Sequence, residues 1–406
     1  LSPTPLLRGA IEAHEVELDR PVLRLAVDAA GNGNWQQLRI MPGALPFVPS
    51  EVVLQQVRIR DGVVSLRTPN APEPLTLSGI DGDVAASSLD GPYRFRGNVS
   101  WNGALRELRI TTTQREADGR LRYKASVRAL DTGNLYTMEG ALSELSAKAQ
   151  HTGVLTARLP LTSLSGEEGA RPRNSRSGDT IDLKANLSGD LDGLRLTDLA
   201  LGFEQNGKPQ LIAGELAASW RNGLRTETRL ASRWLDLDQI ANANASANAQ
   251  SDSRTSTPAE IVRRMIGQIS ALLPTDGSSL LTVDVDQINL GGEALSGVRL
   301  AMARAGGLTS IGELRAALPG NAKGELRGTF GAVPLAGSNA PVSAPPNAHA
   351  ARSVSDSAFE GEIVLRGASY RRFLTWAGAA MLVQPGEANG SGERIDAPFS
   401  LVSQLR

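Results

Sequence analysis

Apolar and polar residues alternate over long stretches of this 406-residue chain. Alternation over four to eight residues is the period of a strand with one buried face. The clearest case is residues 57–66 (VRIRDGVVSL), where the dipeptide Asp61-Gly62 tolerates the positive φ of a tight turn. This segment therefore predicts a hairpin, and its apolar face carries Val57, Ile59, Val64 and Leu66.

Similar segments recur along the chain, many of them bounded by Asn-Gly or Asp-Gly. Turn signals every 8–12 residues are typical of sandwiches, barrels and extended β arrays. The sequence thus predicts a mostly β protein. We expect the further strands at 93–101, 105–113, 121–130, 181–187, 194–203, 210–220, 224–231, 280–290, 298–305, 310–316, 324–330, 359–365 and 397–405.

One segment has helical periodicity instead. Thr257-Pro258 supplies a cap and a first-turn proline, and Pro274 ends a predicted amphipathic helix near 258–273. Two interpretations stay open, a helix packed over one end of the sheet and a membrane-surface or lipid-gating helix. The residues predicted on its apolar side are Ile261, Val262, Met265, Ile266, Ile269, Leu272 and Leu273.

Composition narrows the possible classes of protein. The net charge of −1 provides no electrostatic attraction to nucleic acid, so no nucleic-acid partner is expected. The absence of cysteine excludes disulfides and thiolate metal sites. Aromatic residues make up only 4% of the chain, which is little for a large globular core. The chain begins at Leu1 without a signal peptide or membrane span, so we expect a piece of a longer protein.

Residues with catalytic potential are scattered. His14, His151 and His349 lie far apart, and neither a phosphate-binding P-loop nor a nucleophile-elbow motif occurs. Two pairs of alternating acids, Asp236 with Asp238 and Asp284 with Asp286, are most simply the wet face of a strand. A glycosidase pair on a β scaffold remains an alternative. We expect no enzymatic activity, no cofactor and no metal ion.

The loop in residues 23–35 (LRLAVDAAGNGNW) has three possible roles. Asp28, Asn32 and Asn34 could supply oxygens to calcium, but their spacing is wrong and no distal glutamate follows. A phosphate loop needs a helix start, and the following residues are only weakly helical. The favoured interpretation is a chain reversal at the glycines, followed by Trp35.

The longer stretch of residues 6–35 (LLRGAIEAHEVELDRPVLRLAVDAAGNGNW) resembles a segment of AsmA-like proteins. The hairpin at 57–66, residues 88–99, residues 231–240 and the closing residues 397–405 are similar in style, so the resemblance covers most of the chain. The matching positions are Leu7, Gly9, Ile11, Val16, Leu18, Pro21, Leu23, Leu25, Asp28, Gly31, Asn34 and Trp35.

The resemblance implies a long antiparallel β-sheet curled into an open, taco-like groove with an apolar concave face. It implies a Gram-negative envelope protein in the periplasm, anchored to the inner membrane through a missing N-terminal helix. The implied partner is phospholipid, moved toward the outer membrane. We expect residues 1–240 to form the first part of the groove and 279–406 its continuation. A low-complexity linker at 241–257, the helix at 258–274 and a disordered loop at 334–357 complete the predicted organisation.

Three functions follow as hypotheses. The first is a lipid-conducting groove that supports outer-membrane biogenesis. The second is a scaffold or assembly factor for outer-membrane proteins that binds by β-augmentation. The third is a β-rich enzyme or adhesin acting on polysaccharide. The residues predicted to line the groove are Leu23, Leu25, Val57, Ile59, Val64, Leu66, Ile261, Met265 and Ile269.

Overall fold

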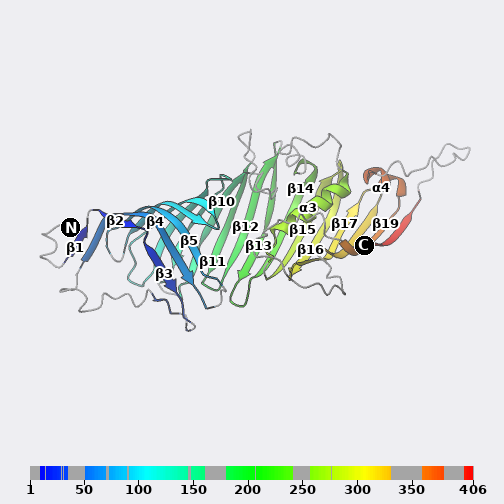
Figure 1. Cartoon of the computed structure of the whole chain (residues 1–406). Helices are drawn as coiled ribbons and strands as arrows, with labels where there is room; N and C mark the ends of the chain where they lie inside the picture. The colour runs from blue at the N-terminus through cyan, green and yellow to red at the C-terminus, as the bar shows by residue number, and fades with distance from the viewer. Residues whose placement is uncertain are drawn as a thin grey trace, which may run out of the picture. The chain divides into compact units, whose positions relative to one another are not determined.

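The computed structural model confirms a mostly β chain whose strands form one long mixed sheet, not closed into a barrel (Figure 1). It describes residues 10–13, 15–28, 30, 32–34, 51–69, 73–88, 91–144, 148–160, 180–205, 207–240, 257–275, 277–330, 359–378 and 397–405. The chain has two compact units. Unit 1 is Leu1–Ser163, Glu167–Pro209 and Ala213–Leu224, and unit 2 is Leu164–Gly166, Gln210–Ile212 and Arg225–Arg406.

Several predicted segments lie outside the described residues. They are the Trp35 end of the opening loop, the linker up to residue 256 and the loop 334–357.

Unit 1 consists of strands that follow one another in chain order. Each of β4 to β11 pairs antiparallel with the next strand in the chain, whereas β1, β2 and β3 all pair parallel with β4. The strands are β1 (Ala10–Ala13), β2 (Val16–Asp19), β3 (Val22–Ala26), β4 (Glu51–Arg67), β5 (Leu75–Ala86), β6 (Tyr93–Trp101), β7 (Ala104–Thr112), β8 (Leu121–Ala129), β9 (Leu135–Leu142), β10 (His151–Pro160), β11 (Thr180–Gly189), β12 (Gly193–Gln205) and most of β13 (Lys208–Ser219).

The hairpin predicted at Asp61-Gly62 is wrong, because β4 runs straight through this dipeptide. Asp61 does have a positive φ of 48°, but it forms a β-bulge, where the register to β5 shifts between Ile59 and Gly62. Backbone bonds of β4 to Arg20 and Pro21, 2.8 and 2.9 Å long, hold its other edge across the bulge. The strand continues because both of its edges are paired.

Of the other Asn-Gly and Asp-Gly dipeptides, one forms the predicted turn and another lies inside a strand. Asn102-Gly103 joins β6 to β7 as predicted, with φ of 50° and 76° at the two residues and Trp101 opposite Ala104. The same kind of signal at residues 81–82 lies inside β5. Strands β1, β2, β5, β9 and β10 are additional to those predicted from the alternation.

Unit 2 contains one parallel strand pair, β14 with β15, and otherwise antiparallel neighbours from β15 to β20. A parallel pair needs a crossover connection, and helix α3 lies between these two strands in the chain. The elements are β14 (Arg225–Asp236), α3 (Pro258–Leu272), β15 (Ser278–Leu290), β16 (Glu293–Ala305), β17 (Leu308–Leu318), β18 (Ala322–Phe330), β19 (Phe359–Gly367), α4 (Tyr370–Trp376) and β20 (Phe399–Leu405).

Helix α3 confirms the predicted amphipathic helix. Thr257 and Glu260 form a reciprocal capping box, and Pro258 occupies the first turn. The helix lies on one face of β15, β16 and β17 (Figure 1). It packs there through Ile266, which is only 7% exposed. Leu272 is a correction, because it is 63% exposed instead of lying on the packed side.

Helix α4 was not predicted, since seven residues are too few for a helical period to stand out. Its Trp376 indole donates a 2.8 Å hydrogen bond to the carbonyl of Leu290, at the turn between β15 and β16. Phe373 packs on Phe399 of β20, with ring centroids 5.2 Å apart. Helix α4 thereby contacts both the turn between β15 and β16 and the strand β20, which are far apart in the chain.

The left-handed backbone of Asp61 predicts how substitutions at this position change stability. We expect Asp61→Val to lower the free energy of unfolding by about 1–2 kcal/mol, because a β-branched residue is strained at positive φ. Asp61→Gly should change it by less than about 0.5 kcal/mol, since glycine adopts this conformation freely. Urea denaturation followed by tryptophan fluorescence measures both.

The control is Ser65→Val, a similar change at an ordinary extended position of the same strand. Equal effects of Asp61→Val and Ser65→Val would contradict a left-handed bulge at position 61.

Candidate functional site

Two rows of side chains cross unit 1 on one face of its sheet. Residues that face each other on paired strands point to the same side, so the register identifies each row. The first apolar row is Val16, Val57, Val84, Phe95, Ile110, Ala125, Met138, Leu155 and Ala185. The second apolar row is Leu18, Ile59, Gly82, Gly97, Leu108, Val127, Tyr136, Ala157, Leu183 and Leu201.

The opposite face of the same strands is charged. Exposed ion pairs join neighbouring strands there, with Arg158 Nε 2.8 Å from Asp182 and Arg58 Nε 3.6 Å from Asp83. Such exposed pairs add little stability, about 0–1 kcal/mol each. Their position shows which face of the sheet is wet, and the apolar rows therefore lie on the other face.

Among the described residues of unit 1, no α-helix covers the apolar rows. Small side chains nevertheless reach low exposure, for example 1% at Ala185 and 7% at Val57. Bulges at Asp61 and at Asp198, where φ is 50°, bend and twist the strands that carry the rows. The result is a wide apolar surface on one face of unit 1, in which neighbouring side chains of the rows shield each other from solvent.

The bulge at Asp61 also keeps the apolar face continuous along β4. It shifts the alternation by one residue, so that Ile59 and Val64 lie on the same side although five positions separate them. Leu23 and Leu25 of β3 lie opposite Val64 and Leu66 and extend this side. The structure thus brings six predicted groove residues to one face: Leu23, Leu25, Val57, Ile59, Val64 and Leu66. Their contact with lipid stays a prediction.

The three other predicted groove residues, Ile261, Met265 and Ile269, belong to α3 in unit 2. Ile261 is 6% exposed, and Ile269 packs against the apolar face of the unit 2 sheet. Ile269 thus helps to cover an apolar face instead of forming its floor. That floor, which we call the covered cluster, consists of Leu281, Leu300, Met302 and Ile311.

A polar pair interrupts the apolar face of unit 1. The Tyr123 hydroxyl hydrogen-bonds Nε2 of His151 across strand β9. Gly140 and Gly153 face each other beneath this pair and leave it room. Burial raises the pKa of Tyr123 and lowers the pKa of His151, which favours the neutral form of both groups. The sequence did not reveal this pair, because the partners are 28 residues apart on strands that are not neighbours.

The loop after β3 is a turn, as the favoured interpretation predicted. Asp28 Oδ1 accepts hydrogen bonds from the backbone N–H groups of Ala30 and Asn32, 2.9 and 2.8 Å long. The amide of Asn34 pairs with the backbone of β3 at Arg24 and Ala26. The Asp28 and Asn34 oxygens thus accept hydrogen bonds from the loop and from β3, and no group of three metal-ligating side chains occurs among the described residues.

The acids considered for catalysis have structural partners. Asp236 is 2% exposed and accepts from the N–H of Gln239, which caps the helical turn at 237–240. Asp238 accepts from the N–H groups of Gly291 and Gly292, 2.7 and 2.9 Å away. Asp284 lies on the wet face near Arg299. These contacts do not support the alternative of a glycosidase pair.

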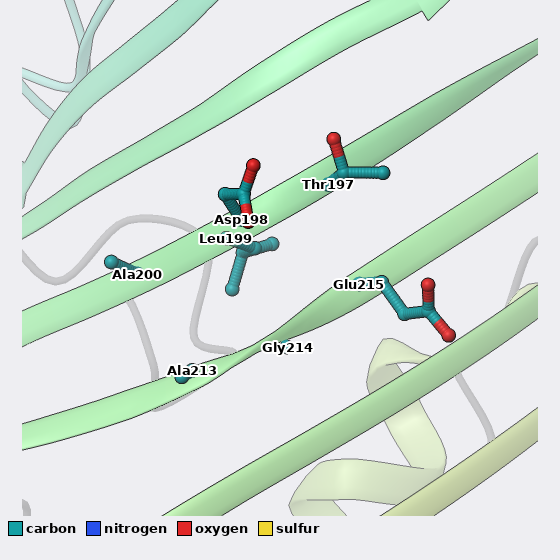
Figure 2. A pocket seen from close by; sticks show the side chains of 7 residues that line it. All are labelled: Thr197, Asp198, Leu199, Ala200, Ala213, Gly214 and Glu215. Carbon is teal, nitrogen blue, oxygen red and sulfur yellow. The ribbon is translucent and has the colours of Figure 1, made fainter.

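A shallow depression lies beside the Asp198 bulge, lined by Thr197, Leu199, Ala200, Ala213 and Gly214 together with two acids. Figure 2 shows that the carboxylates of Asp198 and Glu215 do not converge. Asp198 Oδ2 accepts a 2.8 Å hydrogen bond from the amide of Asn186. The depression therefore offers no assembled polar site.

No protein-family model, curated protein or solved structure matches this chain. Among the described residues, no helix is both long and apolar enough to cross a membrane.

The polar pair predicts a pH dependence of stability. The pKa of histidine is about 6.5 in an unfolded chain, and burial lowers it in the folded protein. Below pH about 6.5 the unfolded chain gains a proton that folded His151 resists, so stability falls until the pH reaches the folded pKa. We expect His151→Gln to remove this loss between pH about 7.5 and 5.5 in urea titrations.

Tyr123→Phe is the matched control, since it removes the hydroxyl and leaves the imidazole buried. An unchanged pH profile in His151→Gln would show that the imidazole is not desolvated.

Proposed function

We propose that this chain is the periplasmic part of an AsmA-like protein and that it conducts phospholipid between the inner and outer membranes. The observation that carries the proposal is the pair of apolar rows, which cross neighbouring strands of unit 1 from β2 to β11 and β12. The resemblance of residues 6–35 to AsmA-like proteins supports it independently. The proposal includes an inner-membrane anchor outside this chain and a role in outer-membrane biogenesis.

The physical basis is non-directional burial of acyl chains. Each buried CH₂ group contributes about 0.8 kcal/mol, whichever apolar side chain it meets. Strands follow each other about 4.8 Å apart, so an acyl chain lying across them contacts several rows at once. Because neighbouring positions are chemically alike, a lipid can shift along the rows without crossing a large barrier. Such transfer needs no catalytic group, cofactor or metal ion.

A matched pair of variants tests the proposal. Leu155 of β10 belongs to the first apolar row, and the next residue, Thr156, is exposed on the opposite face. We expect Leu155→Asp to lower the amount of co-purifying phospholipid about tenfold, because a carboxylate is costly to bury against acyl chains. Thr156→Asp should leave the amount unchanged. Native mass spectrometry and lipid extraction of the purified chain measure both.

A photo-reactive residue at either position gives a second readout without a buried charge. Crosslinks to phospholipid at position 155 and none at 156 would support the proposal. If the native chain holds no lipid, even after incubation with vesicles, the proposal fails.

A second candidate function, a scaffold for outer-membrane proteins, is favoured by strand β20. Among the described residues this strand pairs only with β19. Its Leu401 and Val402 are 49% and 57% exposed, on an edge without charge. An apolar edge of this kind can bind another strand by β-augmentation.

The scaffold hypothesis predicts a protein partner without stoichiometric lipid. Val402→Lys should abolish that binding in crosslinking experiments, because a lysine blocks edge-to-edge pairing. The same change should leave co-purifying lipid unaltered, which separates the two functions.

A further inference from the structure

Helix α3 covers part of the apolar face of unit 2. Ile266 packs with Leu281, Leu300, Met302 and Ile311, the covered cluster, and Met302 is only 1% exposed. Partly buried neighbours in this contact include Val262, Ile269 and Leu273 of the helix and Leu314 and Leu326 of the sheet. The helix therefore occupies the surface that an acyl chain would need.

A cation lies on the same face at the end of the helix. Arg304 of β16 donates hydrogen bonds from one guanidinium nitrogen to the carbonyls of Ser270 and Leu273, 2.6 and 3.1 Å away. These carbonyls belong to the C-terminal end of α3, where the helix dipole is negative. Among the described residues no carboxylate pairs with Arg304, and its Nε is shielded from solvent without a hydrogen-bond partner.

A charged side chain on an apolar face is costly unless an opposite charge compensates it. The helix end supplies only partial negative charge, about half an elementary charge. A phosphodiester would supply a full charge and could accept a bidentate bond from the guanidinium, including its Nε. Arg304 is thus placed to recognise an anionic headgroup beside a surface that suits acyl chains.

We propose that the covered cluster and Arg304 form a binding site for anionic phospholipid, and that α3 is its resident occupant, which must leave before lipid binds. The apolar side of α3 takes the place of the acyl chain and its C-terminal carbonyls take the place of the phosphate. This inference rests on the proposed function and adds to it a headgroup class and a means of regulation.

The composition of α3 suits a helix that leaves its site. Gly267 lies in the middle of the helix, and a Cβ added there would meet no atom within 4 Å. Glycine in a helix interior weakens the helix relative to alanine, and no close packing requires it here. In the last turn of α3, the hydroxyl of Ser270 lies 3.1 Å from that of Thr309 in β17. Both hydroxyls can hydrogen-bond water instead when the helix leaves.

A reversible crosslink tests the inference, because the chain contains no cysteine of its own. The double variant Ser270→Cys/Thr309→Cys places two thiols where the hydroxyls now meet. Its oxidised form holds α3 closed and its reduced form releases it. Both forms of the full chain are incubated with phosphatidylcholine vesicles containing an equal part of phosphatidylglycerol and a photo-reactive phospholipid. Mass spectrometry then maps the crosslinked peptides.

Crosslinks to β15, β16 and β17 should occur in the reduced form and fall to background in the oxidised form. Equal crosslinking of these strands in both forms would overturn the inference. Crosslinks to unit 1 should be the same in both forms and report on the proposed function separately. If neither unit is crosslinked in either form, the proposed function itself fails.

A single substitution tests the same point without a disulfide. We expect Gly267→Ala to stabilise α3 and to lower crosslinking of β15, β16 and β17 about two- to fivefold. Glu260 and the cap are unchanged in this variant, so the fold should persist. An increase in crosslinking would contradict a helix that competes with lipid.

The headgroup assignment has its own test. In Arg304→Met, the preference for vesicles with phosphatidylglycerol over vesicles of phosphatidylcholine alone should fall about tenfold, and Arg304→Lys should retain part of it. Arg299→Met is the control, because this arginine of the same strand lies on the wet face with Asp284 and Glu313. An unchanged preference in Arg304→Met would overturn the role of Arg304.

Discussion

Apolar and polar side chains alternate along each strand, and this alternation must stay in phase across all paired strands. The separation of unit 1 into one apolar and one charged face depends on this constraint. A slip of one residue anywhere would turn every later apolar side chain to the wet face. The bulge at Asp61 prevents this slip, because its extra residue compensates for the odd spacing between Ile59 and Val64. Asp198 does the same in β12. The charged face and the apolar rows are both consequences of this preserved phase.

The sequence predicted those features that depend on neighbours in the chain. Alternation identified the two faces, Asn102-Gly103 identified a turn, and Thr257-Pro258 identified the start of a helix. Asp61-Gly62 misled because a positive φ serves a bulge as well as a hairpin turn. The decision between them depends on β2 and β3, which pair with the far edge of β4, and such pairing is not visible in local sequence.

The functional candidates that were missed share this non-local character. Tyr123 and His151 come into contact because their strands, β8 and β10, both pair with β9. Arg304 looks like an ordinary polar residue of an alternating strand, and its position under α3 follows from a crossover between β14 and β15. In both cases a polar group lies on an apolar face, where an unpaired charge is costly.

Strands β5 to β11 pair only with the strands before and after them in the chain, so the number of strands sets the length of this surface. Each hairpin adds two strands, or about 9.6 Å, without altering the contacts of the others. Removal of β7 and β8 together would bring Phe95 beside Met138 in an unbroken row, whereas removal of one strand would reverse the direction of all that follow. Insertion or loss of whole hairpins would therefore lengthen or shorten the apolar surface in steps of two strands, without disturbing the pairing of the strands that remain.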